Sequence, residues 1–574
     1  MPIRILPPQV VSAIAAGEVV ERPASVVKEL IENALDAGAT RIDIQIEGGG
    51  RRLIEASDDG CGIPSAEIEL AVSRHATSKL QTVEDLFDVR TLGFRGEALA
   101  SIGAVSRLEL NSRTGEEEAG TRLRVEAGRA GPSEKAGIPV GTRASVRDLF
   151  LNIPARLKFL KSEETERRRI TDLVTRYAVA YPSVRITLRV EGRETFHSTG
   201  SGDKREALAG VYGLAIAREM IAVSGGPQAP LQIEGYASPP SVHRSNRKDI
   251  TFFVNGRLIH DVSLASAVIQ AYQGLLMVGR YPLAFLELRV PSQDVDVNVH
   301  PAKAEVRFKN PEMVFGVLQR AVRATLLGQA PPPEFHLPAP WATAPWPASS
   351  RAVSPDWRIA HSVRPEDPSA PLPAQAGMLA GAVPLLRAVG QVGATYLVAE
   401  GPDGLYLIDQ HSAHERILYE DLMAGRQAGT LHSQRLLEPV TVDLPPSKAL
   451  LLHGQLEVMR KFGFEIEPFG SNSFRVASVP ALLAGLDPVQ AIHTLVEDFE
   501  EDEAPLAQEE EAKLAARVCK RAAVKAGQVL SLAEQERLVR DLERCRSPRT
   551  CPHGRPTMIH LSVAALERQF GRRG

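Results

Sequence analysis

Residues 23–39, PASVVKELIENALDAGA, form the stretch that decides the fold of this chain. Pro23 stands at its start, where a helix does not need the N–H that proline lacks, and a glycine near its end is a usual helix terminator. At 100° per residue the apolar side chains share one half of the helix, while Glu29, Asn33 and Asp36 lie together on the other half. The stretch therefore predicts an amphipathic helix that packs on a core and presents a row of polar oxygen atoms.

The segment after this helix indicates a sheet. Residues 41–50, RIDIQIEGGG, carry an isoleucine at every second position and end in glycines, which is typical of a half-buried strand followed by a turn. A second apolar stretch, RRLIEAS at 51–57, leads directly into DDGCGIP at 58–64. Helix and strands alternate, so we expect an α+β body.

The composition sets outer limits. The chain has 574 residues, which at roughly 150 residues per domain is enough for about three to four folded units. Apolar residues make up 44% and charged residues 24%, which excludes wholesale disorder. No long apolar run and no signal-like start is present, so we expect a cytoplasmic protein. The net charge of −3 excludes a uniformly basic nucleic-acid binder but leaves room for a local basic face.

A proline-rich stretch divides the chain. Between Pro331 and Pro373 there are 12 prolines in 43 residues, and neither helix nor sheet can run through such a segment. The pattern predicts a disordered linker over 329–383. The N-terminal body before it holds a second α+β unit, whose strand-like segments are DITFFVNGR at 249–257 and DVDVNVHPAKAEVRF at 294–308.

Five separated segments of the N-terminal body can build a nucleotide site. A P-loop is excluded, because no GxxxxGK[ST] occurs. The segments are ELIENALDAGA (29–39), DDGCGI (58–63), RHATSK (74–79), TLGFRGEAL (91–99) and GTRASVRDLF (141–150).

Each segment has a physical use at such a site. A carboxylate at Glu29 can activate water, Asn33 can give a neutral oxygen to Mg²⁺, and Asp58 can accept the amine of adenine. Glycines in the second segment let the backbone approach a base, and the N–H groups around Gly93 and Gly96 can bind phosphates. Taken singly, each has an ordinary alternative: a solvated helix face for Glu29, a tight turn for DDGCGI. Together and in this order they favour nucleotide binding.

The five segments, in this order, resemble the Bergerat-fold ATPases of the GHKL group, which include gyrase, histidine kinases and MutL. KELIENALDAGAT, RHATSK and GFRGEALASI are most similar to the MutL family of DNA mismatch-repair proteins. The resemblance implies a multidomain α+β chain. Its parts are a GHKL α/β sandwich at 1–205, a ribosomal-protein-like βαβ second domain at 206–328, and a dimerisation and endonuclease domain at 384–574 with a regulatory insertion at about 440–510.

The resemblance also implies roles at the ATP site. Glu29 is implied as the general base, Asn33 as the magnesium ligand and Asp58 as the adenine reader. The further implied ATP contacts are Gly62, Thr77, Lys79, Gly93, Phe94, Arg95, Gly96 and Thr142. Lys303, in the second domain, is implied to reach the γ-phosphate, although taken alone it is an ordinary surface charge.

A basic segment of the second domain is a candidate DNA contact. Arg244, Arg247, Lys248 and Arg257 follow closely in HRSNRKDITFFVNGR, and phosphate binding needs little beyond Lys and Arg. The resemblance implies DNA-backbone contacts in this domain, while a solvated loop is the alternative. No segment indicates sequence-specific readout.

The C-terminal body carries residues that can bind metal. Asp409 stands where a helix N-cap is expected, after the hairpin-like TYLVAEGPDGLYLID. His411 and Glu415 are four apart and share a helix face. The four cysteines of the chain do not suggest a disulfide framework. Three of them, Cys519, Cys545 and Cys551, lie within 33 residues, and the last is part of CPHGRP at 551–556, which also holds a histidine. One Glu, two His and two Cys can hold Zn²⁺ or a pair of divalent ions, whereas His411 alone is more often a core residue.

These C-terminal segments resemble the endonuclease type of MutL, whose signature is a DQHA-x-x-E-x-x-x-x-E run. The matching residues are Asp409, Gln410, His411, Glu415 and Glu420, with Ser412 in place of alanine. The resemblance implies a latent nicking enzyme with Asp409, His411 and Glu415 as catalytic residues. It implies His411, Glu415, Cys519, Cys551 and His553 as ligands of zinc or manganese. Glu420 falls 180° from His411 on a straight helix and is not expected to be a ligand, and Cys545 is expected to be a spare thiol.

Two shorter segments complete the expectations. QRLLEP at 434–439 fits the Q-x-h-L-x-P pattern by which MutL proteins dock the sliding clamp, which implies contacts from Gln434, Leu436, Leu437 and Pro439. Peptides this short also occur by chance. The acidic stretch 497–511 is expected to be a solvated loop.

The resemblance thus implies a homodimeric, ATP-gated mismatch-repair protein that uses ATP and Mg²⁺ and nicks duplex DNA with Zn²⁺ and Mn²⁺. Its implied partners are a MutS-type mismatch sensor and the sliding clamp. One alternative is a MutL that only scaffolds, which would lack DQHxxxE and CPHGRP. Another is a different Bergerat-fold enzyme. A histidine kinase would need a phospho-acceptor helix ahead of Glu29, which only 28 residues precede, and a gyrase subunit would need a longer C-terminal half.

Overall fold

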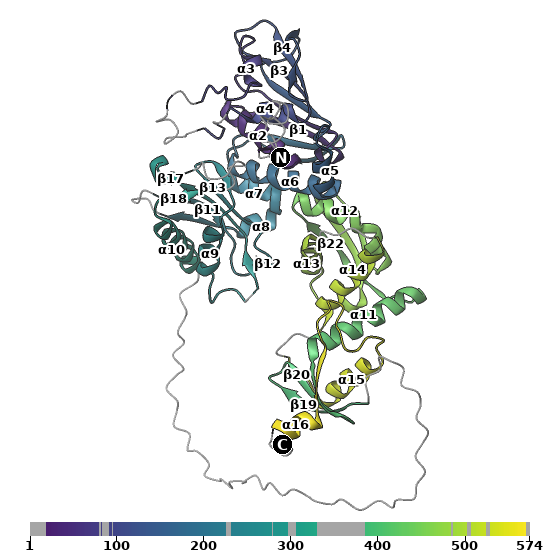
Figure 1. Cartoon of the computed structure of the whole chain (residues 1–574). Helices are drawn as coiled ribbons and strands as arrows, with labels where there is room; N and C mark the ends of the chain where they lie inside the picture. Colours follow the sequence, from purple (N-terminus) through teal and green to yellow (C-terminus); the bar gives the residue numbers. More distant parts are fainter. Residues whose placement is uncertain are drawn as a thin grey trace, which may run out of the picture. The chain divides into compact units, whose positions relative to one another are not determined.

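The computed structural model describes residues 19–569 apart from 80–81, 83–90, 94–95, 226–230, 278, 297–305, 330–384, 484–485, 502–506 and 524–527. By their contacts the residues fall into two compact units, 1–327 with 421–523, and 328–420 with 524–574 (Figure 1). The linker predicted over 329–383 lies, from residue 330 on, outside the described residues.

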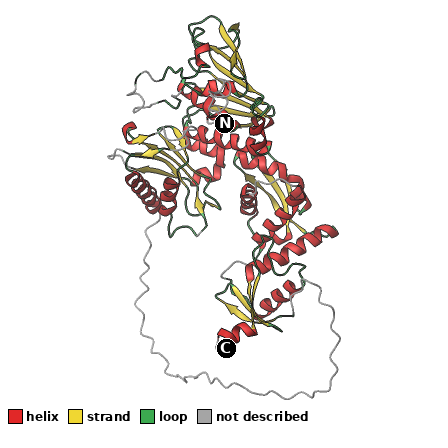
Figure 2. Ribbon diagram, in the orientation of Figure 1, coloured by secondary structure: helices red, strands yellow, loops and turns green. Residues whose placement is uncertain are grey.

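The first domain is built on one large sheet (Figure 2). Its strands run in the order β5-β4-β3-β7-β2-β1-β8-β9, and β6 pairs with β4. The bounds are β1 (Arg41–Glu47), β2 (Leu53–Asp58), β3 (Arg107–Arg113), β4 (Gly120–Glu126), β5 (Arg129–Ala130), β6 (Glu134–Ala136), β7 (Gly141–Arg147), β8 (Arg185–Val190) and β9 (Arg193–His197). The helices are α2 (Pro23–Asp36), α3 (Ile68–Ala71), α4 (Ala98–Ala104), α5 (Pro154–Phe159) and α6 (Glu163–Ala180), with a short 3-10 turn η1 (Gly48–Gly50).

The decisive sequence stretch folds as predicted. It forms α2, which has Pro23 in its first turn, and the predicted half-buried strand is β1. Val26 and Ile31 of α2 are fully buried in the same core as the isoleucines of β1. Because the apolar half of α2 is used in this packing, Glu29, Asn33 and Asp36 on its polar half are left facing a cavity.

The second domain has a five-stranded sheet in the order β10-β11-β16-β13-β14. Its strands are β10 (Ile221–Gly225), β11 (Gln232–Ala237), β13 (Ile250–Val254), β14 (Arg257–Ile259) and β16 (Ala284–Arg289), and its helices are α7 (Lys204–Tyr212), α8 (Leu214–Glu219), α9 (Val262–Ala271) and α10 (Pro311–Gln329). Short pairs are made by β12 (His243–Arg244) with β15 (Tyr281–Pro282) and by β17 (Val295–Asp296) with β18 (Arg307–Phe308). The hairpin β13–β14 turns at Asn255 and Gly256, both with positive φ, as an Asn-Gly hairpin turn requires.

Residues 421–523 contribute a three-stranded sheet in the order β22-β24-β23. The strands are β22 (Ser433–Asp443), β23 (Glu465–Pro468) and β24 (Ser473–Pro480), and the helices are α12 (Pro446–Lys461), α13 (Pro488–Glu501) and α14 (Ala507–Ala522), with a 3-10 turn η4 (Ala481–Leu483). The expected loop at 497–511 is in part helical, because α13 continues to Glu501 and α14 begins at Ala507.

The second unit has a four-stranded sheet in the order β19-β20-β21-β25. Its elements are β19 (Arg387–Val392), β20 (Tyr396–Gly401), β21 (Gly404–Asp409), α11 (Gln410–Ala428), α15 (Leu532–Glu543), β25 (Met558–Ser562) and α16 (Val563–Gln569). The predicted hairpin is β20–β21, and it leads directly into α11. None of the helices in the described part of the chain is both long and apolar enough to cross a membrane.

Candidate functional site

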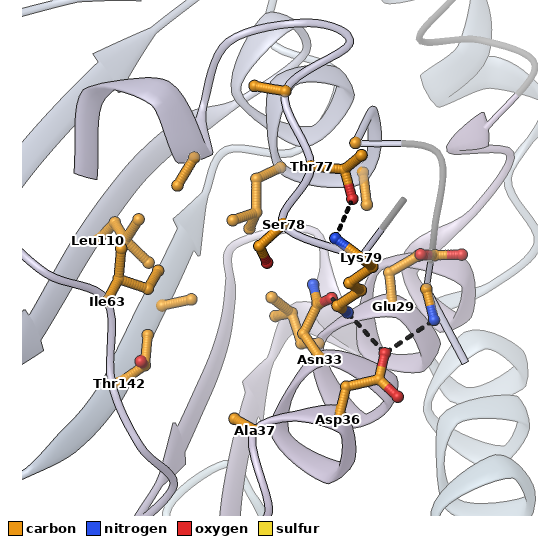
Figure 3. Close-up of a pocket in the computed structure, with 18 of the residues that line it drawn as sticks. Glu29, Asn33, Asp36, Ala37, Ile63, Thr77, Ser78, Lys79, Leu110 and Thr142 are labelled. Atoms are coloured by element: carbon orange, nitrogen blue, oxygen red, sulfur yellow. Dashed lines mark hydrogen bonds and ion pairs between the residues drawn. The ribbon is translucent and has the colours of Figure 1, made fainter. Parts of the chain in front are cut away.

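A cavity of about 740 Å³ lies beside the polar half of α2 (Figure 3). The structure brings the five predicted segments together around it. The predicted site residues that line it are Glu29, Asn33, Asp58, Gly62, Thr77, Lys79, Gly93, Gly96 and Thr142. Phe94, Arg95 and Lys303, which the sequence also implied, lie outside the described residues.

The two neighbouring aspartates of DDGCGI have different tasks. Asp58 ends β2 and lines the cavity, where its Oδ1 accepts the N–H of Gly60 at 2.9 Å and that of Thr142 at 3.3 Å. Burial raises the pKa of Asp58, although these two N–H groups oppose the rise. Asp59 accepts the backbone N–H groups of Thr40 and Arg41 and serves the turn. Of the two, Asp58 is the one that lines the cavity.

Two glycines are required by close backbone approach. Gly62 has a φ of +75°, and a Cβ there would come within 2.2 Å of the carbonyl oxygen of Arg113. Gly96 has a φ of +61°, and its Cβ would meet the carbonyl oxygen of Ala76 at 2.3 Å. Both positions accept only glycine without rearrangement, so the cavity wall at each keeps a bare backbone.

The polar face of α2 holds the candidate base and metal ligand side by side. Glu29 is buried and lines the cavity together with Asn33. The Lys79 ammonium lies 3.3 Å from Asn33 Oδ1 and 2.5 Å from Asp36 Oδ2 (Figure 3). Asp36 is a further site residue, for which the sequence predicted no role; its position on the same helix face as Glu29 and Asn33 is the sequence signal for it.

The predicted basic DNA contact is only in part exposed. Arg247 and Lys248 are exposed. Arg244 is buried, and its Nε lies 3.3 Å from Asp249. Arg257 is also buried, and its Nη2 donates to the carbonyl oxygen of Thr91. The expectation of four surface cations is therefore corrected: the guanidinium groups of Arg244 and Arg257 are buried and bind partners inside the protein.

A second cluster of functional side chains lies in the other unit. Ligand atoms of Glu415, Cys551 and His553 lie within 4.8 Å of one another. Glu415 Oε2 is 3.3 Å from His553 Nδ1, and its Oε1 is 3.2 Å from His411 Nε2. Burial by itself raises the pKa of Glu415, but the two imidazoles outweigh it and lower the pKa to about 2. The buried carboxylate is thus ionised and flanked by a thiol and two imidazoles, which is a donor set suited to zinc.

Local structure explains how this cluster forms. Asp409 caps α11, because its Oδ1 accepts the N–H of Ser412 at 2.8 Å, as the sequence predicted. The CPHG turn closes through the N–H of Gly554 and the carbonyl of Cys551 at 3.0 Å. Glu420 accepts the backbone N–H groups of Arg546 and Ser547, which ties α11 to the segment that leads into this turn. Glu420 therefore holds the segment before the CPHG turn against α11.

The other two cysteines of the C-terminal body, Cys519 and Cys545, lie elsewhere. Among the described residues, the group that can hold a metal consists of Glu415, Cys551 and His553. Cys519 is buried in α14, which belongs to the other compact unit. Cys545 packs against the core of the second unit, and its Sγ is 3.5 Å from the carbonyl oxygen of Asp541. Of the five predicted zinc or manganese ligands, the structure therefore groups three, Glu415, Cys551 and His553. His411 contacts this group through Glu415.

The clamp-like segment QRLLEP lies on β22, at a register shift between Arg435 and Val440. Leu437 is fully exposed there, with a relative accessibility of 105%. An exposed leucine on an irregular strand is available to a partner.

Comparisons with known proteins match three separate parts of the chain. Residues 21–135 match the family described as "Histidine kinase-, DNA gyrase B-, and HSP90-like ATPase", residues 208–327 match "DNA mismatch repair protein, C-terminal domain", and residues 389–530 match "MutL C terminal dimerisation domain". Three similar relatives are each named DNA mismatch repair protein MutL. The relative from Symbiobacterium thermophilum is 38% identical over 99% of this chain and 100% of its own. The one from Desulforudis audaxviator is 42% identical over 99% of both chains, and the one from Acidiphilium cryptum is 42% identical over 100% of both.

Proposed function

Since the chain belongs to the MutL family of DNA mismatch-repair proteins, with a GHKL-type ATPase domain and a C-terminal dimerisation domain, we propose that it is an ATP-gated mismatch-repair endonuclease. The proposed nicking activity rests on one observation: Glu415, Cys551 and His553 lie together, and His411 contacts Glu415. A MutL protein that serves only as a scaffold would not require these metal-binding side chains.

In the ATPase half, Glu29 is the proposed general base. It is buried and lines the cavity, where it can orient a water molecule toward the γ-phosphate. Asp58, held by its two backbone N–H groups, would read the adenine amine. Bare backbone near Gly96 would bind phosphate, a role that peptide N–H groups fill without side chains.

Lys79 and Asn33 suggest how nucleotide binding changes this site. In this structure the Lys79 ammonium is held by Asp36 and lies next to Asn33 Oδ1. Mg²⁺ on Asn33 would repel that ammonium, since like charges a few ångströms apart disfavour each other. We propose that Lys79 then leaves Asp36 for the phosphates of ATP, which would be one step in ordering the lid.

In the C-terminal half, Cys551, His553, Glu415 and His411 would hold divalent metal. A thiolate favours zinc, and the carboxylates of Glu415 and Asp409 favour a harder ion such as Mn²⁺. We propose a tightly held zinc with a structural role and a weaker, exchangeable catalytic ion nearer Asp409 and Glu415. The bound metal would activate water and stabilise charge on the phosphate that is cleaved.

The proposed partners follow from the same architecture. The C-terminal dimerisation domain supports a homodimer. Duplex DNA is the proposed substrate, and Arg247 and Lys248 are the exposed members of the basic segment that remain as candidate phosphate contacts. A MutS-type protein would recognise the mismatch, and Leu437 with its QRLLEP neighbours would bind the sliding clamp.

A nicking assay tests the proposal. Purified protein is incubated with supercoiled plasmid in Mn²⁺, in Mg²⁺ or in a chelator, and conversion to the open circle is measured. Metal-dependent nicking is expected. Equal plasmid integrity in all three conditions, with normal ATP hydrolysis, would leave the scaffold as the better description.

A further inference from the structure

The residues Thr91–Gly93, here called the strap, lie at the cavity beside the backbone near Gly96 that is proposed above to bind phosphate. Gly93 and Gly96 both line that cavity. The strap is not part of a helix or strand, so its position depends on the groups that bind it. Two side chains from different domains do so.

Asp36 binds the strap from the side of α2. Its Oδ1 accepts the N–H of Leu92 at 2.8 Å, and its Oδ2 accepts the N–H of Gly93 at 2.9 Å. A carboxylate that accepts backbone N–H groups makes charge-assisted hydrogen bonds, which are stronger than neutral ones. The same Oδ2 also receives the ammonium of Lys79 at 2.5 Å, so the strap and the lysine share one carboxylate.

Arg257 binds the strap from the side of the second domain. Its Nη2 donates to the carbonyl oxygen of Thr91 at 2.5 Å. Arg257 begins β14, and the turn before it is fixed to α6 because the Tyr181 hydroxyl donates to the carbonyl of Gly256 at 2.8 Å. Phe253 of the same hairpin packs edge-on against Tyr177 at 5.5 Å. The hairpin that carries Arg257 is therefore rooted in the core of the ATPase domain.

The guanidinium of Arg257 also faces the acidic residues of α2. Arg257 is 2% exposed. Burial lowers its pKa, while the charges of Glu32, Asp36 and Glu29 act in the opposite direction and favour the cation. A buried cation is retained in such a place because opposite charges surround it. Arg257 thus touches the strap and neutralises the helix that supplies the proposed base.

We propose that Arg257 and Asp36 are positioning residues that hold the strap from two domains and thereby couple the second domain to the phosphate side of the nucleotide cavity. This proposal rests on the proposed ATP site. A shift of the β13–β14 hairpin would move the Thr91 carbonyl. If Lys79 moved toward phosphate, Asp36 would lose its ion pair with the lysine and keep its hydrogen bonds to the strap. Both events would act on the strap residues Thr91, Leu92 and Gly93.

The test compares three variants with a matched control. Arg257→Lys keeps the charge beside α2 but loses the guanidinium fork, Arg257→Gln keeps a donor but loses the charge, and Asp36→Asn keeps the shape but loses the charge. The control is Arg289→Gln, an exposed arginine on β16 of the same domain. Backbone hydrogen exchange is followed without nucleotide in a peptide that covers the strap, and kcat and KM for ATP are measured on the same preparations.

We expect the rate of hydrogen exchange in the strap to rise roughly fivefold in Arg257→Lys and more in Asp36→Asn. Increases of this size correspond to the free energy of one or two lost hydrogen bonds. The KM for ATP rises in both, Arg257→Gln also lowers kcat, and Arg289→Gln matches the wild type. Unchanged strap exchange in Arg257→Lys and Asp36→Asn would overturn the proposal. Faster exchange throughout the domain with a lowered Tm would also overturn it, because the residues would then be merely structural. If the wild type bound no ATP, the proposed site would fail, yet the exchange data would still show whether the strap is held.

Discussion

Glu415 and His553 lie 138 residues apart in the sequence, yet the carboxylate Oε2 is 3.3 Å from the imidazole Nδ1. On the other oxygen, His411 lies 3.2 Å away. The carboxylate is 4% exposed, so the two imidazoles and the nearby Cys551 thiol are concentrated around one buried charge. This pairing is the geometric basis for the first two predictions.

Glu415→Lys is expected to abolish nicking while dimerisation and ATP hydrolysis persist. The substitution places a cation where the metal would bind, and we expect this buried side chain to lie outside the main dimer interface. Plasmid nicking, metal content and molecular mass are measured on one preparation. Glu536→Lys, which makes the same change at an exposed position of α15, serves as the control. A Glu415→Lys protein that nicks as well as this control would move the assignment to the scaffold.

Cys551→Ser is expected to lower the zinc content and the Tm of the C-terminal domain. The thiol is buried, and a hydroxyl is a much weaker zinc ligand than a thiolate. Zinc is measured by elemental analysis after dialysis. The partly buried Cys545, which lies outside the metal group, provides the matched variant Cys545→Ser. Equal zinc in the two variants would exclude Cys551 as a ligand.

Glu29→Ala is expected to bind ATP but to hydrolyse it about 10²–10⁴-fold more slowly, the usual size of a general-base contribution. The proposed adenine and phosphate contacts come from other residues and are expected to survive. Binding is measured by equilibrium titration and hydrolysis by phosphate release, with the exposed Glu116→Ala as the control. Hydrolysis at the wild-type rate would show that another group is the base.

Asn33→Ala is expected to weaken ATP binding only when Mg²⁺ is present. A neutral amide oxygen is a hard ligand of the kind that magnesium prefers, and Asn33 Oδ1 lies 3.3 Å from the Lys79 ammonium in this structure. Titrations with and without the ion separate this role from a general loss of folding. An equal loss of affinity in chelator would mean that Asn33 supports the cavity itself.

Replacement of Gln434 and Leu436 by alanine is expected to leave ATP hydrolysis and dimerisation intact and to remove stimulation of nicking by the sliding clamp. The segment lies on β22, where the pairing with β24 is irregular, so the change does not disturb a continuous ladder. Glu457→Ala on α12 is the control. If clamp stimulation is the same in the double variant, QRLLEP is an ordinary strand segment.

The sequence alone determined the features that depend on neighbours within one or two turns. The apolar and polar halves of α2, the alternation in β1 and the cap at Asp409 follow from periodicity and local hydrogen bonding. The approach of His411 to Glu415 follows from helical spacing.

The tertiary structure decided what depends on packing between distant segments. It separated Asp58, at the cavity, from Asp59, which closes a turn. It buried Arg257 against the strap, where the sequence had suggested a surface cation, and it placed Cys519 in a different compact unit from Cys551. A residue's charge or thiol is visible in the sequence, but its partner is chosen by which strands and helices pack together, and no local pattern encodes that choice.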